Sequence, residues 1–314
     1  MYSSAVLFVA LVVVQVIMFY VCSSEQIHQK NIYRQMYLFV EPSSGARIVS
    51  GWTADAGQFP YQASLRMVSG IGLVTGCGGS VVHRSWVLSA AHCTVNQITV
   101  VVRAGVSSLL RPEYILETLE WYDYPGYDAH DPSVQPNDLA LLKLQIPLTY
   151  SENLQPIRIQ SRADANRNYG GERLIATGFG RTWTNGPNSE VLQWVYLRGV
   201  TNLNCLQTFQ NPVLINANAI CAGFYNISSQ STCQGDSGGP LVHVDGDGVP
   251  TVVGVASFVA GEPHGCHSGI PAGKYTIWRR YTFERHHTGV RSTAIDKKNM
   301  NLGIAYPYNI KMFR

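Results

Sequence analysis

Short apolar runs, separated by Gly, Pro, Asn and Asp, follow one another through residues 48–273 of this 314-residue chain. The runs are four to seven residues long and rich in Val, Ile and Tyr, which is typical of β-strands. The clearest of them lie at residues 99–102, 139–144, 174–177, 191–196, 241–244 and 251–257. No long segment has the 3.6-residue period of a helix, and no solenoid-type repeat is present. The pattern predicts an all-β protein of barrels or sandwiches, with a boundary between two halves near residues 145–160.

An apolar leader occupies residues 5–21 and contains a single Gln. Its 17 residues are at the short limit for a transmembrane helix. Its N-terminal place and the small residues Cys22, Ser23 and Ser24 behind it indicate a secretory signal peptide of residues 1–24, although the usual basic segment is missing. An uncleaved signal anchor is the alternative. Residues 25–47 are polar and end in Arg47, which makes them a good protease target.

Composition narrows the classes of partner. Hydrophobic residues make up 46% of the chain, which is enough for a sizeable core and excludes a disordered or acidic-tail protein. The net charge of +3 hides an asymmetry, because residues 274–314 carry nine Lys and Arg against two Asp and Glu. The chain before them is therefore mildly acidic, which argues against nucleic acid as a partner.

The seven cysteines indicate an oxidising destination. One of them, Cys22, belongs to the leader, and the other six form the even set that a disulfide framework requires. These six are Cys77, Cys93, Cys205, Cys221, Cys233 and Cys266. No CxxC pair occurs, so a zinc ribbon is not indicated, and an extracytoplasmic protein is favoured.

Three local strings carry the candidate chemistry. They are Leu-Ser-Ala-Ala-His-Cys at 88–93, Asn-Asp-Leu-Ala-Leu-Leu at 137–142 and Cys-Gln-Gly-Asp-Ser-Gly-Gly-Pro at 233–240. Taken singly, His92 could be structural, Asp138 a turn residue and Ser237 part of a glycine-rich turn. Together they place a histidine, an acid and a serine in the chain order of chymotrypsin-type hydrolases.

With Arg-Ile-Val at residues 47–49 upstream, residues 47–273 resemble the trypsin/chymotrypsin family of secreted serine endopeptidases, and most closely its insect digestive chymotrypsin-like or elastase-like members. The resemblance implies two six-stranded antiparallel β-barrels, about 48–155 and 156–273, with the active site between them. It implies that Ser237 is the nucleophile, that His92 is its general base and that Asp138 orients the imidazole. The backbone N–H groups of Gly235 and Ser237 would form the oxyanion hole.

The resemblance also implies a zymogen with the propeptide 25–47. Cleavage after Arg47 would free the α-amino group of Ile48 to pair with Asp236 and order the oxyanion hole. Ser50 stands where the family usually has Gly, and we expect it to be tolerated. The disulfides implied are Cys77–Cys93, Cys205–Cys221 and Cys233–Cys266.

The implied specificity pocket has Ser231 at its base, six residues before the serine nucleophile, where trypsin-like enzymes carry an Asp. Its walls would include Ser257, Val259 and Ala272. An uncharged base cannot offset the burial of a substrate cation, so the pocket should accept apolar P1 residues. Chymotrypsin has glycines where Val259 and Ala272 align, so this narrower pocket should take Leu and smaller aliphatic residues at least as well as Phe.

Other signals are few. Asn226-Ile227-Ser228 is an Asn-x-Ser glycosylation sequon in a polar loop, and such sequons are often unused. His264 and His267 flank Cys266 but fit a surface loop better than a metal site. No calcium loop can be recognised at 109–120. We expect no metal and no cofactor.

The resemblance ends at Gly273, where the chain turns basic. One interpretation is a single inserted residue, Lys274, before a family-like Tyr275. The other, which we favour, is translation through a retained intron, because composition and charge change at that point and Gly-Lys-Tyr is what a splice donor would encode. On that view residues 274–314 are an atypical tail, and the family's C-terminal helix is missing.

The leading functional hypothesis is a secreted digestive endopeptidase, acting extracellularly in a gut lumen as a monomer. Its partners would be peptide or protein substrates, an activating trypsin-like protease and protein protease inhibitors, with no nucleic acid. A cascade protease is less favoured, because residues 25–47 hold no cysteines for a regulatory prodomain. A non-catalytic homologue that acts as a binding protein is the other alternative, but such proteins typically lose one of the residues matching His92, Asp138 and Ser237.

Overall fold

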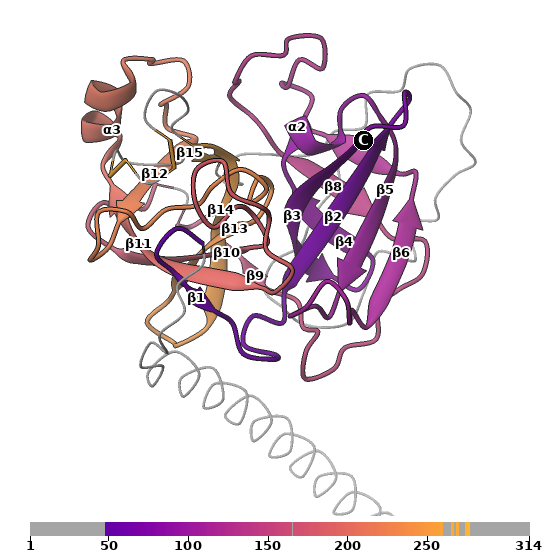
Figure 1. Cartoon of the computed structure of the whole chain (residues 1–314). Helices are drawn as coiled ribbons and strands as arrows, with labels where there is room; N and C mark the ends of the chain where they lie inside the picture. The colour runs from indigo at the N-terminus through magenta and orange to yellow at the C-terminus, as the bar shows by residue number, and fades with distance from the viewer. Residues whose placement is uncertain (1–47, 165, 260–264, 267, 270–273, 277–314) are drawn as a thin grey trace, which may run out of the picture.

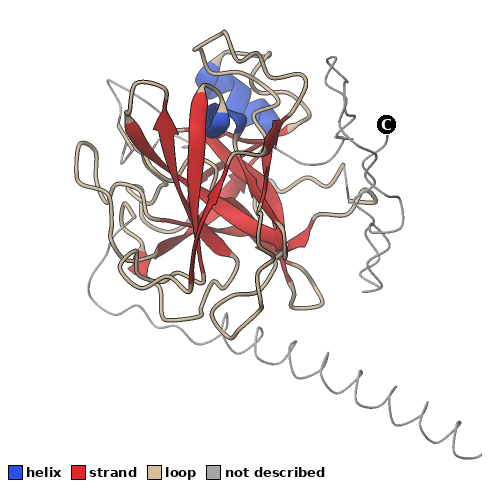
Figure 2. Cartoon of the chain, turned by 90° about the vertical axis from the view of Figure 1, so that its right-hand side faces the viewer, coloured by secondary structure: helices blue, strands red, loops and turns tan. Residues whose placement is uncertain are grey.

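The computed structural model describes residues 48–164, 166–259, 265–266, 268–269 and 274–276. Strands dominate this part of the chain, and they form two sheets that lie side by side (Figure 1). The helical turns lie toward one end of the strands (Figure 2). None of the described helices has the length and apolar character needed to cross a membrane. The all-β architecture expected from the short apolar runs is confirmed.

The first sheet contains the strands of the N-terminal half, in the order β6-β5-β2-β3-β4-β8-β7. Their bounds are β2 Gln62–Ser69, β3 Val74–His83, β4 Trp86–Ser89, β5 Gln97–Ala104, β6 Tyr114–Thr118, β7 Trp121–Asp123 and β8 Ala140–Lys143. Every pairing is antiparallel. In β5, the side chains of Val100, Val102 and Ala104 are buried while the residues between them are partly exposed, so the period of two aims one face at the core.

The second sheet follows the order β1-β11-β10-β13-β14-β15-β12, and a β11–β12 pairing closes it into a barrel. The bounds are β1 Trp52–Thr53, β9 Arg158–Ile159, β10 Arg173–Gly178, β11 Gln193–Val200, β12 Ala219–Phe224, β13 Pro240–Val244, β14 Pro250–Phe258 and β15 Lys274–Thr276. β9 pairs with β14 in parallel, whereas the other described pairings are antiparallel. The described strands number seven and eight per sheet, more than six each, because two- and three-residue strands such as β1, β7 and β9 add to the main ones.

Two short helices complete the described chain. α2 (Ala91–Thr94) is a single turn that follows β4, and α3 (Asn202–Phe209) follows β11. Thr201 caps α3 by accepting a hydrogen bond from the amide of Asn204 at 3.3 Å, and Gln210 ends it in the left-handed conformation. The absence of long helical periods in the sequence agrees with these lengths.

The two sheets share part of their core. Trp194 of β11 lies with Phe59 at a ring-centroid distance of 5.6 Å, and both belong to one buried cluster with side chains from each sheet. A second cluster fills the closed barrel and includes Ile48 and Tyr275. The packing fixes the relative position of the sheets, and therefore of any side chains that meet between them.

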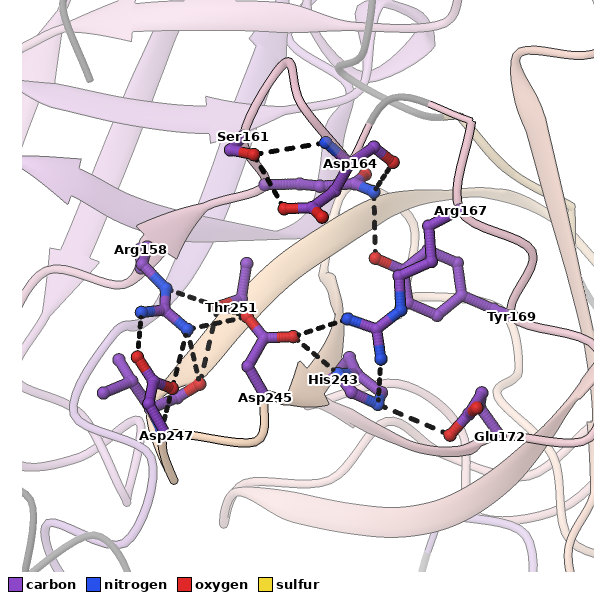
Figure 3. A network of polar contacts seen from close by, with 12 residues as sticks. Arg158, Ser161, Asp164, Arg167, Tyr169, Glu172, His243, Asp245, Asp247 and Thr251 are labelled. Atoms are coloured by element: carbon purple, nitrogen blue, oxygen red, sulfur yellow. Dashed lines mark hydrogen bonds and ion pairs between the residues drawn. The ribbon is translucent and has the colours of Figure 1, made fainter. Parts of the chain in front are cut away.

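An ionic network anchors the connection between the halves to the β13–β14 hairpin (Figure 3). Arg158 of β9 binds Asp245 at 2.6 Å and Asp247 at 2.7 Å, and Arg167 binds Asp245 at 2.9 Å. His243 adds a contact of 2.9 Å between its Nδ1 and Asp245. The sequence placed the boundary of the two halves at 145–160, and this network holds the end of that segment on the second sheet.

β15 lies just past Gly273, where the resemblance to a known family was expected to end. It pairs with both β12 and β14, and the ring of Tyr275 is fully buried. The described chain therefore continues the barrel through Thr276. The domain limits remain predictions, and residues 277–314 lie outside the described part of the chain.

Candidate active site

His92 and Asp138 meet beside β4 and β8 of the first sheet. The one-turn helix α2 carries His92, and Asp138 lies just before β8. The Nδ1 atom of His92 is 2.7 Å from Asp138 Oδ2, and the His92 amide donates to Oδ1 at 2.9 Å. Because the carboxylate is an acceptor, it favours the tautomer with the proton on Nδ1 and leaves Nε2 as a base. The predicted contact between these two residues is present.

The contact between the two residues makes His92 a stronger base and keeps Asp138 ionised. Burial alone would lower the pKa of His92, but the charge of Asp138 and the hydrogen bond to it outweigh burial, so the pKa is raised above 6.5. Burial would raise the pKa of Asp138, yet its hydrogen bonds and the His92 charge lower it overall. The Asp138 side chain is 4% exposed and that of His92 32%. The imidazole can therefore reach a substrate, while the carboxylate is shielded from water.

Ser257 is a third partner in this cluster that the sequence did not identify as one. We expected it to be a pocket wall, but its hydroxyl donates to Asp138 Oδ2 at 2.6 Å. Ser257 lies on β14 of the second sheet, so this bond crosses from one sheet to the other. No local sequence signal distinguishes a strand serine with this role, because the contact joins residues 119 positions apart.

Ser237 lies on the turn that precedes β13, partly exposed. Its carbonyl accepts a hydrogen bond of 2.7 Å from the amide of Gly78 in β3, which fixes the turn against the first sheet. The hydroxyl of Ser237 makes no hydrogen bond to His92 Nε2, which instead lies 3.6 Å from Cys93 Sγ. Nucleophile and base often tighten into contact only when a substrate is bound.

Gly235 gives this turn its shape. Its φ of 95° is one that residues with a side chain rarely adopt, and a Cβ there would lie 3.0 Å from Gly180 Cα. Within the described chain, the N–H groups of Gly235 and Ser237 make no hydrogen bond to protein. Two uncommitted donors beside a serine hydroxyl can receive a developing oxyanion.

Asp236, between them, turns inward. It is buried and accepts hydrogen bonds from the amides of Gly180 at 2.8 Å and Cys233 at 2.9 Å. Burial raises its pKa to about 6 against the effect of these bonds. No described cationic side chain forms an ion pair with it.

Ile48 begins the described chain with its side chain fully buried and a φ of 60°. A left-handed β-branched residue is a strained one. Ser50 is also left-handed, at φ 56°, which explains a preference for glycine there, and its hydroxyl is 2.6 Å from that of Ser229. Arg47 lies outside the described residues.

The expected base of the pocket, Ser231, is buried and pairs with Val49, whose carbonyl accepts from the Ser231 amide at 3.3 Å. The Ser231 hydroxyl donates to the Thr232 carbonyl at 2.7 Å. Val259 packs against the Cys233–Cys266 disulfide. Ala272 lies outside the described residues, as do His264 and His267, so the described chain includes only part of the predicted pocket.

All three disulfides that the resemblance implies are present. They join Cys77 to Cys93, Cys205 to Cys221 and Cys233 to Cys266. The first ties α2, next to His92, to β3. The sequon residue Asn226 is exposed on a turn that Gln230 closes by accepting three backbone hydrogen bonds.

A histidine paired with a buried aspartate, and a serine on a tight turn beside free backbone donors, together make the kind of site that serine hydrolases use. Here it lies between two packed β-sheets. The chain belongs to the trypsin family: the family described as Trypsin matches residues 48–279. The resemblance, the fold class and the assignment as a serine endopeptidase are confirmed.

Several relatives cover most of the chain. A collagenase of Hypoderma lineatum is 32% identical over 78% of this chain and 88% of its own length. Trypsin 5G1 of Aedes aegypti is 33% identical, over 73% and 81% respectively. Chymotrypsin-like elastase family member 1 of Rattus norvegicus is 34% identical, over 70% and 81%. Relatives with three different names match this chain at similar identity, so the family alone does not give the P1 preference.

A solved structure, that of HL collagenase, superposes with a TM-score of 0.65 and 32% sequence identity. It covers 73% of this chain and 94% of its own. The described sheets therefore share the fold of this collagenase.

Proposed function

We propose that this serine endopeptidase acts through His92, Asp138 and Ser237. His92 Nε2 removes the Ser237 proton as the hydroxyl attacks a peptide carbonyl, and an acyl-enzyme and a free amine result after His92 protonates the leaving nitrogen. Water then releases the acyl group by the same route. The observation that carries this proposal is the buried Asp138 carboxylate, 2.7 Å from Nδ1 of a partly exposed His92.

The N–H groups of Gly235 and Ser237 form the oxyanion hole in this proposal. Their lack of hydrogen bonds within the described chain and the left-handed Gly235 support it. Loss of one such donor typically costs about 3–4 kcal/mol of transition-state stabilisation.

Activation by cleavage after Arg47 is part of the same proposal. A buried Ile48 held at positive φ is strained only while a peptide bond precedes it, because an N-terminal residue has no φ. Cleavage also creates an ammonium group, which would compensate the buried Asp236 carboxylate. Both effects favour the cleaved form.

The preferred substrates have an apolar P1 residue. The uncharged, buried Ser231 offers no partner to a lysine or arginine, and Val259 adds bulk near the Cys233–Cys266 wall. Secretion into the extracellular space, with the leader 1–24 removed, and digestion of dietary protein in a gut lumen agree with the three disulfides. We also propose that the exposed Asn226 is glycosylated during secretion.

The test uses the full chain after treatment with trypsin and a set of peptide substrates that differ only at P1. We expect hydrolysis after Leu, Phe and Ala, and little after Lys or Arg. Ser237→Ala should abolish it, whereas Ser161→Ala, a serine on the segment after β9, should not. A fully active Ser237→Ala variant would refute the assigned nucleophile. A wild-type chain that is cleaved after residue 47 and yet inert would instead favour a non-catalytic binding homologue.

A further inference from the structure

A second carboxylate lies beside the His92–Asp138 pair. Thr94, the last residue of α2, donates its hydroxyl hydrogen to Asp123 Oδ1, which lies at the end of β7. The same Thr94 hydroxyl is 3.0 Å from the Ala91 carbonyl, at the start of the turn. Thr94 is completely buried. The turn that carries His92 is therefore tied at its end to β7.

Asp123 has a fixed position in the sheet. It pairs with Ala140, two residues beyond Asp138, in the antiparallel β7–β8 ladder. The next amide, that of Tyr124, donates to the Leu139 carbonyl at 2.9 Å. Strand pairing thus holds the Asp123 carboxylate on the same short stretch of sheet that positions Asp138.

The groups that face Asp123 are acidic or neutral. Burial raises its pKa to about 6, the Asp138 charge adds to that effect, and the Thr94 hydrogen bond opposes it. The phenol of Tyr127 is a neutral neighbour. Burial raises its pKa to about 12, together with the charges of Asp138, Asp123 and Asp131. No described Lys, Arg or His forms an ion pair with Asp123. The nearest positive charge that can form on α2 is the imidazolium of His92.

We propose that Asp123 is a positioning residue for His92, which it acts on in two ways. Through Thr94 it holds α2, and through its negative charge it stabilises the imidazolium that forms during proton transfer. The inference rests on the proposed role of His92. It adds one acid, Asp123, that supports His92 without touching the substrate.

The charge effect has a definite sign. An ionised Asp123 favours protonated His92, so its removal should lower the pKa of His92. The two groups should also titrate as a coupled pair, because the ionisation of each changes the charge that the other experiences. An acid further from the site should produce neither effect.

The first measurement is an NMR titration of the His92 Nδ1 proton in the full chain, cleaved after Arg47 and carrying Ser237→Ala to prevent self-digestion. We expect a broadened, two-step titration with Asp123 present. Asp123→Asn, which has the same shape, should give a single step at a midpoint lower by about half a pH unit. Asp131→Asn, an exposed acid that bonds to Ser133, is the control and should leave the titration unchanged.

The second measurement is the pH profile of the enzyme with its serine intact. Asp123→Asn should reduce kcat about threefold at pH 8, the equivalent of half a pKa unit, with KM little changed. Thr94→Val should also reduce kcat without raising KM. If Asp123→Asn does not fold, the His92 titration of the chain that retains Asp123 still tests the inference, because it should show two steps.

A single-step titration with Asp123 present, or equal shifts in the Asp123 and Asp131 variants, would overturn this inference. Such a result would leave the role of Ser237 untouched. A serine variant that retains activity would refute the proposed function and leave the His92 titration interpretable.

Discussion

Asp138 accepts three hydrogen bonds, which come from two distant parts of the chain. The His92 amide and Nδ1 come from α2, and the Ser257 hydroxyl comes from β14. The motif around His92 and Asp138 predicted the first contact, because the order of these residues is family-specific. The motif could not predict the bond from Ser257, because the sequence around a serine in a strand does not show which distant residue it contacts.

The raised pKa of His92 leads to a prediction about pH. Only neutral His92 can accept the Ser237 proton, so kcat/KM should be full at alkaline pH and should fall as the pH drops through the His92 pKa. Because that pKa is raised, the midpoint of the acid limb should lie above 6.5. A profile of kcat/KM on one uncharged substrate measures it. A midpoint well below 6.5 would mean that the Asp138 contact does not dominate the environment of His92.

Ser257→Ala tests whether this residue serves the triad or only the pocket. Loss of a hydrogen bond to a buried charge typically costs about 1.5–3 kcal/mol, so we expect kcat/KM to fall roughly tenfold, mainly through kcat. Ser231→Ala is the control, because within the described residues its hydroxyl bonds only to the Thr232 carbonyl, and its loss should affect KM and P1 preference instead. Identical behaviour of the two variants would mean that Ser257 contributes only to the pocket wall and that its bond to Asp138 does not affect catalysis.

At the scale of elements, the apolar runs predicted the interior strands best. The runs at 99–102, 174–177, 241–244 and 251–257 all lie inside β5, β10, β13 and β14. β3 was not identified, because its sequence Val-Thr-Gly-Cys-Gly-Gly-Ser-Val-Val-His has three glycines, and glycine lowers strand propensity. The structure gives the reason for one of them: a Cβ on Gly78 would lie 2.9 Å from Gly239 Cα. A contact between distant segments, invisible in local patterns, imposes that glycine.

Gly78→Ala should therefore disturb the Ser237 turn. The added methyl meets backbone, which cannot move aside cheaply, and the Gly78 amide would lose its bond to the Ser237 carbonyl. We expect a loss of roughly 2 kcal/mol in the free energy of unfolding and a large loss of kcat. Gly70→Ala, in the β2–β3 hairpin, is the matched control, since its Cβ would meet only Ile98 Cγ2 at 3.9 Å. Thermal unfolding and kcat measured together will show whether the two variants differ as predicted.

At the scale of the whole molecule, the family motifs predicted the two-sheet architecture and the three disulfides, because those motifs are specific to one fold. The C-terminal limit is harder, since a basic composition does not reveal whether a short segment completes a barrel. β15 lies between β12 and β14 and buries Tyr275, although it follows the point where the composition changes. Barrel closure is a long-range pairing, and no local pattern encodes it.

The zymogen that we propose should not activate itself. The bond to be cleaved follows Arg47, while the uncharged Ser231 gives the mature pocket no partner for a guanidinium. The purified full chain, incubated alone, should stay inactive, and trace trypsin should produce activity together with a new N-terminus at Ile48. Arg47→Leu should reverse this dependence and permit slow self-activation. Spontaneous maturation at a rate that rises with protein concentration would mean that the pocket is misassigned.

The central claim is that Ser237 becomes a reactive nucleophile beside His92 once the chain is cleaved after Arg47. Labelling with an organophosphonate that has an apolar P1 group, followed by peptide mapping, tests it most directly. The account predicts one label per molecule, on Ser237, only after cleavage, and none in His92→Ala. Label on another residue, equal labelling before cleavage, or no label in a cleaved and folded chain would contradict it.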